Sequence, residues 1–179
     1  MRTLLLAASA MFLSACAQLQ VSNYRDTPIQ FDPIRFFNND LIAEGIVMNR
    51  RGEVTRYFTA EIKATWDEQG GVLDEVFQWS DGEVQTRVWR FSAHADGSYT
   101  GTAGDVIGEA TMVYAGNAIN MDYRLDVPLS NGNSIAINMD DWLYQVSDRT
   151  LVNVTEMKKF GFRVGRVVLS MRVVDEPAS

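Results

Sequence analysis

Two acidic side chains in the last third of the chain have a spacing that could support acid–base chemistry. If Asp148-Arg149 closes a two-residue turn, strand pairing sets Asp141 directly opposite Glu156 on one face of a sheet. Two carboxyl groups that close would drive one pKa upward and could serve as acid and base. Asp140 points to the opposite face of the same strand and does not complete this pair. The alternative is a bulge or twist that places the two carboxylates in water.

A second candidate group lies around the turn Asp81-Gly82. If that turn has two residues, Glu75 and Arg90 share a face with several aromatic side chains. An acid and a base on an aromatic face indicate either a buried ion pair or a polar anchor for a ligand headgroup. The residue types alone leave both interpretations open.

The length of the turn near Gly132 decides whether Tyr123 lies opposite Asp141 on the paired strands. A three-residue loop at 131–133 pairs Val127 with Ile137, and this apolar match favours it over a two-residue loop. Continuing that register puts Tyr123 opposite Asp141 on the buried side. The candidate ligand-binding residues are therefore Glu75, Arg90, Tyr123, Asp141 and Glu156.

The sequence lacks the usual catalytic and metal-binding constellations. His94 is the only histidine, sits beside the Asp96-Gly97 turn, and has no cysteine or second histidine with which to form a zinc site. Cys16 is the only cysteine, so a disulfide framework and a Cys-rich metal site are both excluded. We expect no catalytic residue, no metal and no cofactor, and a binding or structural protein is favoured over an enzyme.

The N-terminal residues have the features of an export signal. Arg2 supplies a positive charge, residues 4–13 are mostly apolar, and Leu13-Ser14-Ala15-Cys16 ends the run with small residues. This stretch resembles the lipobox of bacterial lipoproteins, which implies cleavage before Cys16 and lipid attachment, including palmitate, on that cysteine. Ala17 in place of aspartate favours the outer membrane by the same resemblance. The alternative is an ordinary secretory signal in which the cysteine is incidental.

Composition bounds the rest of the chain. The 179 residues carry a net charge of −7, which argues against nucleic acid as a partner. The sequence predicts a signal peptide at 1–15, a lipidated tether at 16–33 and a single β-barrel domain at 34–175. Within the tether, Tyr24 and Phe31 belong to a small apolar set that could instead dock on the domain. Residues 34–39 are expected to form one helical turn that plugs an end of the fold.

From Leu41 onward apolar and polar residues alternate, as in half-buried strands. The clearest run is 54–66, in which only Arg56 interrupts the apolar face. Turn pairs such as Gly116-Asn117 recur at short intervals, and a two-residue loop there matches apolar side chains across the hairpin. About nine or ten short strands with this spacing predict an all-β antiparallel barrel or sandwich.

Several segments in one order resemble the bacterial lipoprotein family called domain of unknown function 3833. The resemblance runs from about Phe36 to Val173 and implies an envelope location and one β-rich domain, without assigning chemistry. The segments that carry it are Phe36-Phe37-Asn38-Asn39-Asp40-Leu41, Leu73-Asp74-Glu75-Val76-Phe77, residues 99–108, Asp140-Asp141-Trp142-Leu143-Tyr144, Met157-Lys158-Lys159-Phe160-Gly161 and residues 163–170.

Three functions follow as hypotheses. The first is a lipid-anchored, periplasm-facing protein of the outer membrane whose lipocalin-like (calycin-type) barrel binds a lipid or another small apolar ligand. The second is a structural or assembly accessory lipoprotein of the outer membrane with a filled barrel, no ligand and an exposed apolar patch on one rim. The third is a barrel enzyme that uses Asp141 and Glu156 and requires them to share a face.

Overall fold

The computed structural model describes residues 19–129 and 131–174. In chain order the elements are η1 (Val21–Tyr24), α1 (Pro33–Phe37), β1 (Asp40–Asn49), β2 (Val54–Asp67), β3 (Gly70–Trp79), β4 (Val84–Ala93), β5 (Tyr99–Thr102), β6 (Ala110–Ala115), β7 (Ala118–Pro128), β8 (Ser134–Ser147), β9 (Thr150–Lys159) and β10 (Phe162–Val173).

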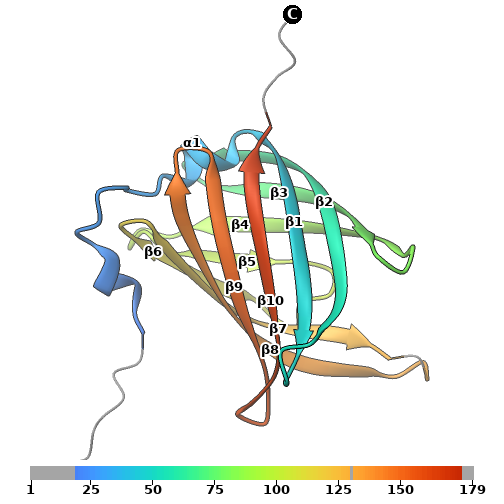
Figure 1. The fold of residues 1–179 in the computed structure, drawn as a ribbon. Helices are drawn as coiled ribbons and strands as arrows, with labels where there is room; N and C mark the ends of the chain where they lie inside the picture. The colour runs from blue at the N-terminus through green and yellow to red at the C-terminus, as the bar shows by residue number, and fades with distance from the viewer. Residues whose placement is uncertain (1–18, 130, 175–179) are drawn as a thin grey trace, which may run out of the picture.

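The ten strands form one closed antiparallel barrel (Figure 1). Each strand pairs with the next along the chain, and β1 pairs with β10 to close the ring. Burial alternates strictly along most of β2, where Phe58, Ile62 and Trp66 are among the buried residues and their neighbours are exposed. This confirms the expected all-β barrel, since period-two patterning places one set of side chains inside.

The helix α1 covers one end of the barrel (Figure 1). The Asp32 carboxylate accepts hydrogen bonds from the amides of Ile34 and Arg35, and Pro33 occupies the first turn, so the helix start is well defined. The Phe37 ring stacks on Trp66 with 5.0 Å between centroids. The expected helical plug is thus present, one residue earlier than the sequence placed it. Within the described ranges, neither helix has the length and apolar character that crossing a bilayer requires.

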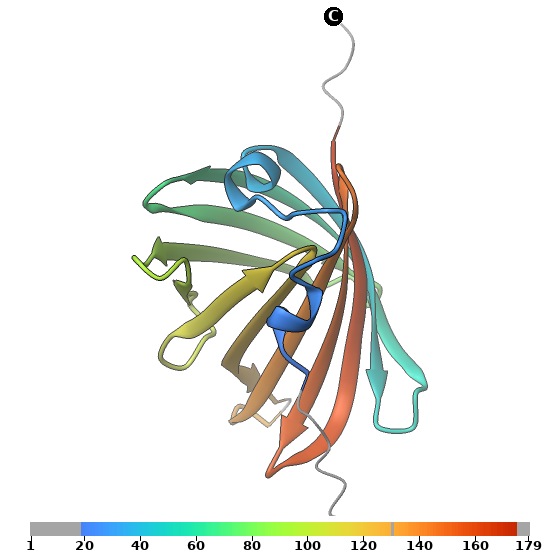
Figure 2. The same ribbon diagram turned by 90° about the vertical axis from the view of Figure 1, so that its left-hand side faces the viewer.

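The chain ahead of α1 is attached to the flank of the barrel (Figure 2). The Phe31 amide donates to the Gly116 carbonyl at 2.8 Å, and the Asn117 amide donates to Thr27 Oγ1 at 2.9 Å. Gly116 has φ +56°, and a Cβ there would lie 1.7 Å from the Tyr24 carbonyl oxygen. Between Tyr24 and Phe31 the docked interpretation of the N-terminal segment therefore describes the structure, and the free tether does not.

Two hairpins fix the inward faces of β6, β7 and β8. The Gly116-Asn117 loop has two residues, as predicted, because Ala115 pairs with Ala118. At the next hairpin Val127 pairs with Ile135 instead of Ile137. A shift of two residues leaves every side chain on its predicted face, so Tyr123 and Asp141 both point inward although they are diagonal neighbours.

Apolar side chains are exposed at the end of the barrel opposite α1. They come from the β1–β2, β3–β4, β7–β8 and β9–β10 connections, which all lie at that end (Figure 1). Phe160 and Phe162 are the most exposed, at 85% and 77% of their surface. We call this set the open rim; its members are Val54, Val84, Leu129, Phe160 and Phe162.

Candidate functional site

The barrel encloses a cavity of about 580 Å³ that extends from α1 toward the open rim. Its walls are mainly apolar, with Phe37 at the closed end and Val127 near the rim. The other apolar lining residues that matter below are Val47, Phe77, Trp79, Trp89, Met121, Val167 and Leu169. Size and lining both fall in the range of small-molecule pockets, which are mostly apolar with a few polar groups.

Arg87 on β4 supplies the one guanidinium deep in this cavity among the described residues. Its Nε and Nη2 atoms donate to the Asp105 carboxylate at 3.0 and 2.6 Å, a forked geometry that fixes the guanidinium plane. Glu75 lies directly across the β3–β4 ladder, and its Oε2 is 3.9 Å from Arg87 Nη1. Arg87 is thus hydrogen-bonded to Asp105 and only in electrostatic contact with Glu75.

Glu75 is a buried carboxyl with little compensation. Only 6% of its surface is exposed, and Oε2 accepts no hydrogen bond from any described residue. Burial raises the pKa of Glu75 to about 7; Arg87 opposes this rise, while Asp105 and Asp141 add to it. A carboxyl of this kind gains from any donor that enters the cavity.

Asp141 on β8 forms the second polar point of the cavity. The Tyr123 hydroxyl donates to Asp141 Oδ2 at 3.3 Å, whereas Oδ1 accepts no hydrogen bond within the described part of the chain. Burial raises the pKa of Asp141 to about 6, and the hydroxyls of Tyr123 and of nearby Thr155 oppose the rise. The Thr155 hydroxyl itself donates to Asn153 Oδ1 at 2.9 Å and not to Asp141. Burial also raises the pKa of Tyr123 well above its ordinary value, so its hydroxyl remains a donor.

Another charged group lies nearer the open rim. Arg56 is the inward-facing exception on β2, and its guanidinium stacks 4.1 Å from the centre of the Trp79 ring. Its Nη2 atom donates to Asp81 at 2.8 Å and to Glu83 at 2.9 Å. Asp81 and Glu83 therefore hold the Arg56 guanidinium at the mouth, where it forms no ion pair with Glu75 or Asp141.

Comparison with known proteins assigns the family. The sequence profile of the family described as "Protein of unknown function (DUF3833)" matches residues 10–173, nearly the whole chain. The chain belongs to this family. The resemblance drawn from the sequence segments is thereby confirmed. No curated protein matches the chain.

A solved structure is similar to this DUF3833 member in fold. It is titled "Structure of S-type Phycobiliprotein Lyase CPES from Guillardia theta" and superimposes with a TM-score of 0.52. The match covers 90% of this chain and 96% of that chain at 10% sequence identity. At this identity the likeness establishes a shared lipocalin-like barrel architecture and carries no chemistry.

In the DUF3833 barrel, Arg90 lies on the outer face and not beside Glu75. The Trp79 amide donates to the Glu83 carbonyl at 2.9 Å, so three residues, with Gly82 at φ +87°, close this hairpin. The two-residue loop expected at Asp81-Gly82 was wrong by one residue, which exchanges the faces of β4. Arg87 takes the inward position. The Gly after Asp is equally typical of three-residue loops and could have signalled this.

Glu156 of the DUF3833 chain also lies on the outer face. The Asp148-Arg149 turn has two residues as predicted, but the β8–β9 register shifts between Gln145 and Ser147. This bulge sets Asp141 opposite Thr155 and Asp140 opposite Glu156. The expected Asp141–Glu156 pair is wrong, and the enzyme hypothesis that required it fails.

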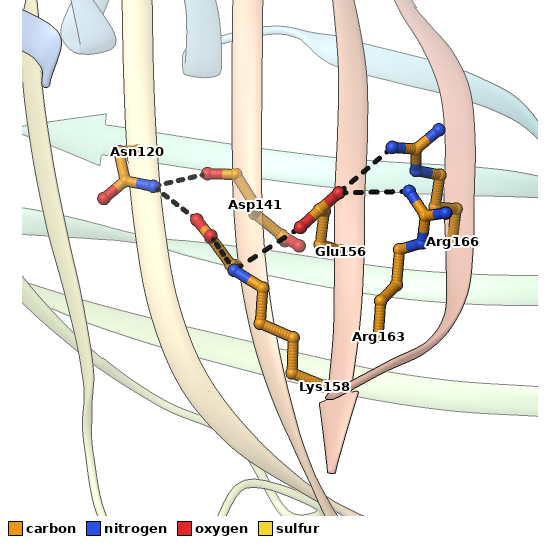
Figure 3. A network of polar contacts seen from close by, with 7 residues as sticks. Asn120, Asp141, Glu156, Lys158, Arg163 and Arg166 are labelled. Atoms are coloured by element: carbon orange, nitrogen blue, oxygen red, sulfur yellow. Dashed lines mark hydrogen bonds and ion pairs between the residues drawn. The ribbon is translucent and has the colours of Figure 1, made fainter. Parts of the chain in front are cut away.

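Glu156 belongs instead to a network of surface charges (Figure 3). Its Oε1 accepts from Arg166 Nη2 at 3.1 Å and lies 3.6 Å from Arg163, while Lys158 bridges it to Asp140. The Arg166 hydrogen bond lowers the pKa of Glu156, so this carboxylate stays ionised. Such a network of opposite charges suits strand pairing on the solvated outer face.

Of the five ligand-binding candidates, the structure brings Glu75, Tyr123 and Asp141 together in the cavity. Arg87 and Asp105 complete this group, and the sequence interpretation missed both roles. Asp105 lies in the connection between β5 and β6 and pairs with Arg87 on β4. We call these five residues the interior polar cluster: Glu75, Arg87, Asp105, Tyr123 and Asp141.

Proposed function

We propose that this protein binds a small, largely apolar ligand, such as a lipid, inside its barrel at the bacterial envelope. The observation that supports this most directly is the apolar cavity of about 580 Å³. Closely packed interiors leave few voids larger than a water molecule, so a hollow of this size in a core is typical of a binding site. Because α1 covers one end of the barrel, the ligand would enter from the open rim (Figure 1).

A cavity-filling substitution tests this proposal. Val167 lines the cavity, whereas Val168 on the same strand points outward. The delipidated full chain is incubated with a phospholipid and fatty-acid extract and analysed by native mass spectrometry. We expect one retained ligand in the wild type and in Val168→Trp, and roughly tenfold less retention in Val167→Trp. A wild-type chain that retains nothing, or equal retention in the two variants, would refute ligand binding in the barrel.

The envelope location is a separate part of the proposal. Cys16 lies outside the described residues, so its support is the lipobox-like sequence Leu13-Ser14-Ala15-Cys16. More than one acyl chain on Cys16 would hold the protein stably on the outer membrane, facing the periplasm.

Metabolic labelling tests the anchor. With a clickable fatty acid, we expect the wild type to take up label and to sediment with the outer membrane. Cys16→Ser should lose the label and most of the membrane association. If the wild type takes up no label, or if Cys16→Ser sediments as before, the anchor proposal is wrong, and ligand binding by the barrel still stands or falls on its own test.

The open rim supports a second candidate function, an accessory role in assembling other envelope components. Phe160 and Phe162 are too exposed to serve the core, and exposed apolar groups mark interaction surfaces. This candidate predicted a filled barrel, which the cavity contradicts. Crosslinking through position 162 in intact membranes would capture one fixed protein partner if the accessory role holds.

A further inference from the structure

The interior polar cluster carries an imbalance between acceptors and donors. Three carboxyls, those of Glu75, Asp105 and Asp141, share one guanidinium, that of Arg87. Asp105 takes the hydrogen-bonding edge of that guanidinium. Glu75 Oε2 and Asp141 Oδ1 are left without any hydrogen bond from the described residues. Buried polar atoms without partners are rare in native proteins and call for an explanation.

Both unpartnered atoms belong to residues that line the cavity. Glu75 is on β3 and Asp141 on β8, and each is at least nine-tenths buried. They act electrostatically on the same interior, since Asp141 disfavours ionisation of Glu75. Most of the remaining lining is apolar and includes Trp89, whose ring meets Tyr123 edge-on at 5.3 Å. The cavity therefore offers acceptors at its polar points and an apolar surface elsewhere.

We infer that the ligand is an amphiphile whose polar end is a hydrogen-bond donor carrying positive charge, such as a protonated amine, and that this end is bound by Glu75 and Asp141. The inference rests on the proposed ligand binding and specifies its chemistry. An ammonium group supplies three donors and one positive charge, which matches two acceptors in a cluster with excess negative charge.

The same arrangement rejects the commonest apolar amphiphiles. Where Glu75 and Asp141 are ionised, a fatty-acid carboxylate would bring a further negative charge against them in a place shielded from water. Arg87 would relieve this only in part, because Asp105 already occupies its Nε and Nη2 donors. An alcohol offers one donor without charge and is expected to bind between the two extremes. The cavity would therefore select an ammonium ligand over a carboxylate by repelling the carboxylate as much as by attracting the ammonium.

Three ligands with one alkyl chain and different ends test the inference. The full chain in non-ionic detergent is titrated with octylamine, octanol and octanoate, and binding is followed by tryptophan fluorescence, since Trp79 and Trp89 line the cavity. We expect octylamine to bind roughly tenfold or more tightly than octanol, and octanoate to bind weakest. The octylamine affinity should rise from about pH 5 to about pH 8, where the carboxyls ionise and the ammonium keeps its proton.

Neutral isosteres provide the matched variants. Glu75→Gln with Asp141→Asn keeps the shape of the cavity, and we expect it to remove the preference for octylamine and its pH dependence. Asp74→Asn is the control, because Asp74 neighbours Glu75 in sequence and is exposed on the outer face. It should bind the three ligands nearly as the wild type does. Partition of the ligands into detergent is the same for every variant, so it does not affect the comparison between them.

The outcomes separate the two proposals. Octanoate or octanol binding as tightly as octylamine would overturn the inference and leave an apolar binding cavity. A double variant that keeps the full preference would also overturn it. If none of the three ligands binds, the proposed function fails as well.

Discussion

Arg87→Met should lower the free energy of unfolding by about 3 kcal/mol. Arg87 is mostly buried and holds Asp105 by three contacts, so its removal leaves a poorly solvated carboxylate unpaired. The loss lies at the low end of the range for broken buried ion pairs, since Asp105 keeps a quarter of its side chain exposed. Chemical denaturation at neutral pH measures this change directly.

The control for this variant is Arg90→Met on the same strand. Arg90 is exposed on the outer face, and we expect a change within about 0.5 kcal/mol. Adding Asp105→Asn to Arg87→Met should restore part of the lost stability, because the unpaired charge is then absent. Similar losses for the two arginine variants would show that Arg87 has no special role in the interior polar cluster.

Replacing Glu75 by Gln should stabilise the empty protein at high pH and leave it nearly unchanged at low pH. The pKa of Glu75 is about 7 in the folded chain and ordinarily 4.5, so the folded state keeps a proton that the unfolded chain has released. Stability therefore falls as pH rises through this interval, and the cost is complete above about pH 7. For one such carboxyl the total is on the order of 3 kcal/mol.

The difference between wild type and Glu75→Gln isolates this contribution from other titrations. Denaturant unfolding at about pH 4, 6 and 8 should show the two curves converging at low pH and the variant more stable at about pH 8. Asp74→Asn should diverge only slightly from the wild type, because its exposed carboxylate acts on Glu75 more weakly than Arg87, Asp105 and Asp141 do. Curves that run parallel, or a variant that is less stable at high pH, would contradict the argument. The charged or titratable groups acting on Glu75 are Arg87, Asp105, Asp141 and Asp74.

Prediction of the site from the sequence depended on whether each error in register was even or odd. The β7–β8 hairpin was displaced by two residues, and Tyr123 and Asp141 kept their predicted inward face. The β3–β4 hairpin was displaced by one, and Arg87 replaced Arg90 inside. Because the side-chain period of a strand is two, a small odd error exchanges the whole set of candidates.

The position of Glu156 was not accessible from local sequence. The Asp148-Arg149 turn was predicted correctly, and the error arose at the bulge between Gln145 and Ser147. Gln145 there binds the β6–β7 turn, since its amide donates to the Asn117 carbonyl at 2.8 Å and its carbonyl accepts from Asn117 Nδ2. Contacts between residues 28 positions apart therefore stabilise this bulge, and turn propensities do not report them.

If Cys16 carries the proposed lipid anchor, the docked N-terminal segment would restrict how the barrel sits on a bilayer. Its attachment at the β6–β7 turn places η1 at the flank of the barrel (Figure 2), and Leu19 lies two residues before η1. Cys16 is three residues earlier and reaches at most about 10 Å from Leu19. Acyl chains on Cys16 would thus be joined to the barrel by a very short segment. The protein would then lie in a narrow range of orientations and would not rotate freely above the lipid surface.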